Sequence, residues 1–433
     1  MAGPPPNELI TSDLGIQDEL VLDLADRFGT PLYIYDADLI RRRWRSLLSI
    51  LPSRAELCYS VKANPNLAIL RILVELGASF EIASGGELAL ALAAGAQPEK
   101  VVFVGPGKTE HEIAQAVDVG VGVLVVEAED ELIRIGAAAS RVNKTIDVAL
   151  RLNLGRGGGD LSMGGSTQFG MSMETARAIL SGGFPRKLSI IGVHSYFGTG
   201  ILDTRLIEKQ TKEILTAADE LESIIGYEFK FLDLGGGFGI PYFQDDEHPD
   251  WGKIQRSIDT KVTRYCDRRQ NRVRICFESG RYIVGESGIF VATVLSVKQN
   301  FGRRFVVLDG GTGVFRGWDR YLGARVSPLR ILGCGNGETQ VVTFCGPLCT
   351  SLDRLAADVE VDDLDRLAAD VEVVVPRVGA RVCFYNAGAY GMTAAPGLFL
   401  SQGYPAEVLI DNGEVNLVSK QWGTLDVLTR YRD

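Results

Sequence analysis

The chain has 433 residues, of which 46% are hydrophobic and 23% are charged, as in a globular protein. Its formal net charge of −10 argues against nucleic acid as a partner, because no basic excess exists to displace counterions from a phosphate backbone. Seven cysteines without paired metal-type spacing favour reduced thiols, no metal site and a cytoplasmic location. No signal peptide and no apolar run approaching roughly 18 residues is visible, so a membrane partner is not expected.

Up to about residue 288, short apolar strands alternate with amphipathic helices. Helical stretches, in which apolar residues recur at three- and four-residue steps, include 67–76, 86–94, 127–140 and 204–224. Eight is the number of strands in a closed (β/α)8 barrel. The eight segments with the pattern of buried strands are 58–62, 80–83, 101–104, 123–126, 147–153, 190–197, 229–234 and 273–278.

The remainder of the chain predicts strands without long intervening helices, at 289–297, 304–309, 340–345, 380–386, 406–410 and 415–420. We therefore predict an α/β protein with two domains. A TIM barrel covers residues 35–288, and an all-β, Greek-key-like barrel domain combines residues 1–34 with 289–433.

One segment of the second domain is repeated. Residues 352–361 recur letter for letter as 364–373, which we interpret as a tandem duplication or a sequence artefact rather than a repeat architecture. One copy is expected to form a loop or an extra helical turn.

Polar and glycine residues gather where the barrel strands end, and TIM-barrel enzymes keep their chemistry at that face. Lys62 places an amine there, which could form a Schiff base with a carbonyl cofactor or substrate. Taken alone, Lys62 could equally be a surface lysine, and any one strand end could be an ordinary turn. The residues that share this position are Lys62, Glu81, Arg151, His194, Thr199, Gly235, Gly236, Gly237, Glu278 and Arg281.

Five motifs, in chain order, carry a family resemblance: 59–64 (YSVKAN), 235–238 (GGGF), 278–281 (ESGR), 346–349 (GPLC) and 386–391 (NAGAYG). Together they resemble the fold-type III pyridoxal phosphate decarboxylases, the group of ornithine and diaminopimelate decarboxylases. The resemblance spans nearly the whole chain. It implies a pyridoxal 5'-phosphate-dependent enzyme that decarboxylates an α-amino acid and forms a homodimer with shared active sites.

The resemblance also assigns roles to residues. Lys62 would hold the cofactor covalently, and burial beside the cofactor could lower the pKa of its amine as this requires. Glu278 would keep the pyridine nitrogen protonated. A protonated ring favours decarboxylation over racemisation, for which alanine racemases would have an arginine in place of Glu278. A structural ion pair with Arg281 is the alternative for Glu278. The phosphate cradle would comprise the backbone of Gly235, Gly236 and Gly237 with Thr199, Arg281 and Tyr390, and further cofactor contacts would come from Glu81, Arg151 and His194.

Two departures from the family pattern concern the cofactor ring and the substrate. Tyr196 stands where the diamino-acid decarboxylases have the histidine that stacks on the ring, with His194 two residues earlier on the same side of the predicted strand. Thr350 stands where those enzymes have an Asp or Glu that binds the distal ammonium of the substrate. A buried ammonium without a carboxylate is costly, so the distal group is not expected to be an amine.

The 346–350 sequence (GPLCT), with 163–165 (MGG), is similar to a side branch of the family that includes glutamyl-carrier-protein and exosortase-associated decarboxylases. The branch implies a substrate acylated through its side chain, possibly tethered to an acyl carrier protein. Arg316 could bind a substrate carboxylate or a phosphopantetheine phosphate, or be a solvated surface residue.

Cys349 would act as a general acid from the neighbouring subunit, and its alternative is a small buried hydrophobic residue. Rival functions are a diaminopimelate decarboxylase of lysine biosynthesis, an amino acid racemase, and a non-catalytic cofactor-binding protein.

Overall fold

The computed structural model describes residues 14–155, 157–159, 161–242, 246–270, 272–315, 328–333, 339–355, 371–429 and 431. The chain forms two compact units. We call Arg43–Ile240 with Glu247–Tyr282 the barrel unit, and Met1–Arg42 with Pro241–Asp246 and Ile283–Asp433 the sheet unit. The boundaries between the units lie within α2 (Ala37–Ile50) and α10 (Arg281–Val284). The sequence pattern predicts them at 34/35 and 288/289.

The barrel unit contains a closed ring of eight strands, which confirms the predicted (β/α)8 fold. Neighbouring strands pair in parallel, as they must when each is followed by a helix that returns the chain to the same end of the barrel. In chain order the strands are β2 (Ala55–Ser60), β3 (Ser79–Ile82), β4 (Val101–Phe103), β5 (Val123–Val126), β6 (Ile146–Arg151), β8 (Leu188–His194), β10 (Phe231–Asp233) and β11 (Arg274–Ser279).

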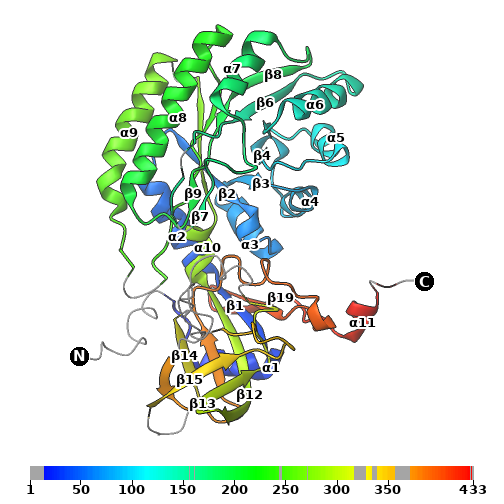
Figure 1. Ribbon diagram of the computed structural model, residues 1–433, viewed down its shortest axis with the longest axis vertical. Helices are drawn as coiled ribbons and strands as arrows, with labels where there is room; N and C mark the ends of the chain where they lie inside the picture. The colour runs from blue at the N-terminus through cyan, green and yellow to red at the C-terminus, as the bar shows by residue number, and fades with distance from the viewer. Residues whose placement is uncertain are drawn as a thin grey trace. The chain divides into compact units, whose positions relative to one another are not determined.

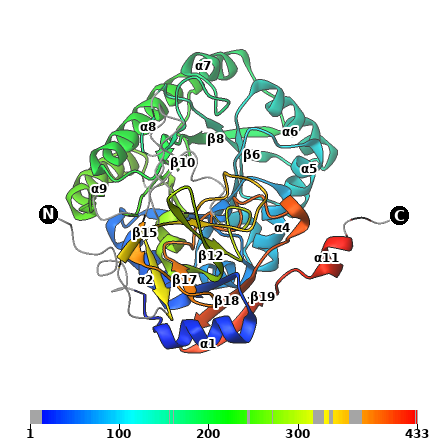
Figure 2. The ribbon, with the colours of Figure 1, turned by 60° about the horizontal axis from the view of Figure 1, so that its bottom comes forward.

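Helices lie outside the ring of strands, as Figures 1 and 2 show. In α8 the buried residues Ile207, Ile214 and Leu221 recur every seven residues and form one apolar stripe toward the strands. The helices of this unit are α3 (Leu67–Glu75), α4 (Gly85–Ala93), α5 (Glu110–Val119), α6 (Glu129–Arg141), α7 (Met173–Gly182), α8 (Thr204–Ile225) and α9 (Trp251–Arg268).

Small and branched apolar side chains fill the interior of the barrel. Cys58, Val102, Val125 and Cys276, from four strands, are each fully buried in one cluster. This packing closes the middle of the barrel, so the chemistry is confined to the strand ends.

The sheet unit consists of nine described strands in one branched sheet. Its main path runs β16-β15-β13-β12-β1-β18-β19, and β17 pairs with both β12 and β14. The strand β1 pairs antiparallel with β12 and parallel with β18, so the N-terminal segment joins the C-terminal part of the chain. The strands are β1 (Leu32–Asp36), β12 (Gly288–Asn300), β13 (Arg303–Leu308), β14 (Leu329–Leu332), β15 (Thr339–Cys345), β16 (Val371–Val374), β17 (Arg381–Phe384), β18 (Ala406–Asp411) and β19 (Glu414–Ser419).

An amphipathic helix, α1 (Asp18–Phe28), belongs to the same unit (Figure 2). Its buried residues Val21 and Leu24 share a core cluster with Leu32 of β1 and Ile289 of β12. The second domain therefore carries a helix besides its sheet, which the expectation of an all-β domain did not include. The expected bulge of the duplicated segment falls largely on residues 356–370, which lie outside the described residues.

Within the described residues, no helix has both the length and the apolar character that a membrane span requires. The six cysteines in this part of the chain are all free thiols.

Candidate active site

Lys62 lies in a short 3-10 turn, η1 (Val61–Ala63), immediately after β2. Its Nζ donates to both carboxylate oxygens of Glu81 on β3, at 2.7 and 2.6 Å. The parallel register, in which Ser60 is the partner of Glu81, brings the two side chains to the same rim. The Lys62 side chain is 40% exposed and that of Glu81 is 1% exposed, and the ion pair with Glu81 holds the amine in place.

The turn that follows β11 packs directly against the Lys62 turn. A Cβ on Gly280 would lie 2.5 Å from Cβ of Ala63, so only glycine allows this approach. The glycine of the 278–281 motif therefore has a structural reason: it brings the strand end that carries Glu278 beside the one that carries Lys62.

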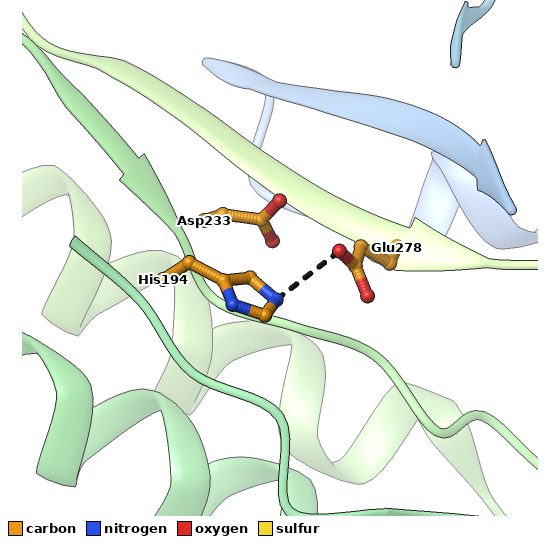
Figure 3. Close-up of side chains that lie close together, drawn as sticks. All are labelled: His194, Asp233 and Glu278. Carbon is orange, nitrogen blue, oxygen red and sulfur yellow. Dashed lines mark ion pairs between the residues drawn. The ribbon is translucent and has the colours of Figure 1, made fainter. Parts of the chain in front are cut away.

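Three side chains converge inside the barrel near this rim: His194 from the end of β8, Asp233 from the end of β10, and Glu278 from β11 (Figure 3). His194 and Asp233 are partners in the strand register. Nε2 of His194 is 3.2 Å from Oε1 of Glu278, and the three residues are at most 2% exposed. Their donor atoms all lie within 4.8 Å of one another.

The two carboxylates of this group have opposite tendencies. Burial opposes ionisation of Glu278, but the neighbouring His194, Lys62 and Arg151 outweigh it and lower its pKa to about 2. Burial and the nearby Glu278 charge raise the pKa of Asp233 well above its ordinary value. Of the two, Glu278 is therefore the carboxylate that ionises more readily, and Asp233 is the one that keeps its proton more readily.

Several polar atoms of the group have no hydrogen-bond partner within the described structure: Oε1 of Glu278, Oδ2 of Asp233 and both ring nitrogens of His194. The contact between His194 and Glu278 is close enough for an ion pair but lacks the direction of a good hydrogen bond. Because unpaired buried polar atoms are costly and uncommon, they indicate a position where a ligand atom binds.

The glycine-rich turn after β10 is shaped by close backbone approaches. Gly235 and Gly237 have φ angles of +65° and +93°, which favour glycine. A Cβ on Gly236 would lie 1.9 Å from the carbonyl oxygen of Glu278. Oδ1 of Asp233 accepts a hydrogen bond from the Gly235 N–H at 2.9 Å, so the same aspartic acid fixes this turn.

Thr199 lies in β9 (Gly198–Thr199), which pairs with β7 (Leu161–Ser162). The side chain of Gln210 on α8 connects this region to the glycine turn, since it accepts from Phe197 N–H and donates to the Leu234 carbonyl. Tyr196 is half-buried and follows the end of β8 at His194, so strand alternation does not extend to it. Arg281 begins α10.

Two of the predicted residues, Cys349 and Thr350, lie in a loop of the sheet unit. Cys349 is exposed, which excludes the alternative that it is a buried hydrophobic residue. Asp353 shapes the loop: its two carboxylate oxygens accept hydrogen bonds from Leu348 N–H and from the N–H and hydroxyl of Thr312.

Tyr390 also lies in the sheet unit, in the turn of the 386–391 motif. Asn386 and Tyr390 both adopt positive φ, at 54° and 58°. A Cβ on Gly388 would lie 1.8 Å from the Val284 carbonyl oxygen, so this motif too is needed for a tight backbone contact. Arg316 lies outside the described residues.

Comparison with known proteins places this geometry in a class. The family model "Pyridoxal-dependent decarboxylase, pyridoxal binding domain" matches residues 37–285. The chain belongs to this family of pyridoxal-dependent decarboxylases, and it is a pyridoxal phosphate-dependent amino acid decarboxylase. The comparisons therefore support the predicted decarboxylase activity and not the racemase alternative.

Individual relatives refine the comparison. The chain is 35% identical over 415 residues to the L-glutamyl-[BtrI acyl-carrier protein] decarboxylase of Niallia circulans, covering 93% of this chain and 94% of that protein. It is 30% identical over 431 residues to the diaminopimelate decarboxylase of Aquifex aeolicus, covering 96% and 95%. The structure of Helicobacter pylori diaminopimelate decarboxylase complexed with L-lysine matches with a TM-score of 0.82 at 26% identity, covering 95% and 98%.

The residues of the barrel fit the cofactor of this family. Oε1 of Glu278 is buried and has no hydrogen-bond partner in the described structure, so it could accept the N–H of a pyridine ring, and Lys62 offers the amine that an aldehyde requires. The positive-φ glycine turn presents backbone of the kind that binds phosphate. Sequence reasoning gave no role to Asp233, Gln210 or Glu127, although Asp233 stands at a predicted strand end, two residues before Gly235.

Proposed function

We propose that the substrate is an α-amino acid acylated through its side chain, such as a glutamyl group tethered to an acyl carrier protein. The observation that carries the proposal is the uncharged Thr350 after Cys349. Its hydroxyl oxygen already accepts the Leu352 N–H at 3.2 Å. Asp353, the next carboxylate along the loop, is 2% exposed, and both its oxygens are occupied by hydrogen bonds. Neither residue offers a charge to a distal ammonium, and a neutral acyl group needs none.

The name of the Niallia circulans relative supports this reading, because that protein acts on a carrier-bound glutamyl group. The rival substrate, free diaminopimelate, is supported by a diaminopimelate decarboxylase that is 30% identical and covers 96% of this chain. The two candidate substrates differ in charge at the distal end of the side chain: diaminopimelate carries an ammonium there, and an acylated side chain is neutral.

In the proposed reaction, different residues bind the cofactor, keep its ring protonated and donate a proton to the substrate. Pyridoxal phosphate, when bound, supplies an electron sink for the pair of electrons released as the carboxyl group leaves. Glu278 would keep the ring nitrogen protonated, and the Lys62 amine would hold the cofactor aldehyde. Thr199, Arg281, Tyr390 and the 235–237 backbone bind the phosphate. Cys349 of the neighbouring subunit donates a proton to the substrate Cα, which makes the homodimer the active form.

The test is carbon dioxide release from free ornithine, lysine, diaminopimelate and glutamate and from carrier-tethered glutamate. We expect the tethered glutamate to be turned over and the free diamino acids to be poor substrates. Efficient turnover of free diaminopimelate by the wild type would overturn the proposal in favour of the rival.

A substitution sharpens the test. Thr350→Asp should raise kcat/KM for a diamino acid by about 10-fold or more, because a charge-assisted hydrogen bond contributes roughly 1.5 to 3 kcal/mol. It should also reduce turnover of the acylated substrate. Ser351→Asp, which adds the same charge at the next, exposed residue, is the matched control and should change neither.

A further inference from the structure

Arg151, the last residue of β6, is the register partner of His194 and is almost fully buried. Its Nη1 donates to Oε1 of Glu127 at 2.8 Å. Its guanidinium also lies over the ring of Phe169, 4.8 Å from the centroid. The cation is therefore held between a carboxylate and an aromatic face, which restricts its orientation.

Glu127 follows β5 and uses both of its carboxylate oxygens. Besides Arg151, Oε1 accepts the Gly105 N–H at 3.0 Å, and Oε2 accepts the Gly170 N–H at 2.9 Å. One buried carboxylate thus connects the segments that follow β4 and β6 with Arg151 itself. A charge with this many directed partners is fixed in position.

Two further buried charged residues, Glu131 and Lys108, hold the backbone of Glu127 in place. The Glu127 N–H donates to Oε2 of Glu131 at 2.8 Å, and Oε1 of Glu131 accepts from Lys108 at 2.8 Å. Lys108 has a fully buried side chain, and it also donates to the carbonyls of Gly105 and Val125. The Lys108 ammonium therefore has three acceptors, which completes a buried network that ends at Arg151.

Arg151 matters to the site because it is one of the cations that favour ionisation of Glu278. It also occupies the strand position next to His194. Any change in the direction of its guanidinium therefore changes the electrostatics where the cofactor ring is assigned.

We propose that Glu127 is a positioning residue for the cofactor site. It orients the Arg151 guanidinium toward the expected position of the cofactor ring, and it also binds the backbone N–H of Gly170. The proposal rests on the assignment of the cofactor ring beside Glu278. No part of it requires Glu127 to touch cofactor or substrate.

The test uses full-length apoprotein and four variants: Glu127→Gln, Arg151→Met, the double variant, and Glu407→Gln. Glu407 is the matched control, because it is an equally buried carboxylate that accepts a hydrogen bond from Tyr35 in the sheet unit. The readouts are the Kd for pyridoxal phosphate from fluorescence quenching, the visible circular dichroism per bound cofactor, and the Tm of the apoprotein.

We expect Glu127→Gln to raise the cofactor Kd roughly 10-fold and to alter the circular dichroism band, since the charge that orients Arg151 is lost. The double variant should bind no more weakly than Arg151→Met, because Glu127 acts through Arg151. Glu407→Gln should lower Tm but leave Kd and the band unchanged, as a purely structural loss would.

Other results would overturn the inference. If Arg151→Met weakens binding while Glu127→Gln leaves Kd within about twofold, Glu127 does not position Arg151, and additive effects in the double variant lead to the same conclusion. If Arg151→Met itself has no effect, the assigned place of the cofactor is wrong instead. Should Glu127→Gln fail to fold, Glu127→Asp carries the test: it withdraws the charge by one methylene, and an unchanged Kd would refute the proposal.

Discussion

Replacing Glu278 with Gln should separate catalysis from cofactor binding. The pKa of Glu278 falls from 4.5 to about 2 in the folded chain. At about 1.4 kcal/mol per unit, the surroundings favour its negative charge by about 3 kcal/mol. In the amide variant the negative charge of Glu278 is lost, and Lys62 and Arg151 keep only their partners Glu81 and Glu127, so a further positive charge on the cofactor ring is disfavoured. Because the protonated ring is most needed as the carboxyl group leaves, a penalty of this size should lower kcat roughly 100-fold.

The measurement is single-turnover release of carbon dioxide at saturating substrate, beside a fluorescence titration of cofactor into the apoprotein. The expected split is a large fall in kcat with a cofactor Kd raised by less than about 10-fold, since the phosphate contacts and Lys62 remain. Glu407→Gln, which changes a buried carboxylate of the sheet unit, is the control and should keep most of the turnover. If kcat of Glu278→Gln stays within about threefold of the wild type, or if kcat and binding fall together, the reasoning about the charge is wrong.

Three further predictions follow from the same geometry. Borohydride reduction of the yellow holoenzyme should fix the cofactor to Lys62, and peptide mapping that recovers the adduct on the buried Lys108 would reject the assignment. Since burial and the nearby Glu278 charge raise the pKa of Asp233, the folded chain keeps a proton there that the unfolded chain releases, so this group costs stability as pH rises above the ordinary aspartate range. Asp233→Asn should therefore raise the apoprotein Tm by a few degrees at pH 7 and by less at pH 4, and an equal shift at both would contradict this. Mixing Cys349→Ala with Lys62→Ala should restore part of the lost activity if subunits exchange and share sites, whereas no recovery after verified exchange would separate the two residues.

The fold was predictable because its signals are local. Each barrel strand is a short apolar run, and the predicted 123–126 segment matches β5 while the other seven overlap the observed strands with ends shifted by at most three residues. The largest shifts, of three residues, are at the start of β2 and at the end of β8, where the predicted segment continues to Phe197 but the strand ends at His194. The helix α1 was missed because a single helix beside many strands has only its own periodicity to reveal it, and that segment was considered only as a possible part of the sheet domain.

The site was predictable only in part, because strand ends identify which residues reach the rim but not which of them touch. Lys62 and Glu81 are 19 residues apart in sequence and meet through the parallel register. Glu127 follows a predicted strand like the others, yet its role depends on Gly105, Arg151 and Gly170, which lie tens of residues apart in sequence. No spacing rule connects such partners, so contacts of this kind required the three-dimensional arrangement.

The protonation states of the two buried carboxylates follow from their neighbours and not from their residue types. Asp233 and Glu278 are equally removed from water, but Glu278 faces His194 and receives the fields of Lys62 and Arg151, while Asp233 faces the charge of Glu278. Two carboxylates this close do not both ionise, and the cations decide which of them does. Glu278 is therefore the better candidate for an anionic acceptor at the expected ring position, and Asp233 holds the glycine turn through Gly235. If the cofactor ring lies beside Glu278, its protonation would depend on the whole charge cluster, and the network around Arg151 would influence it together with Glu278.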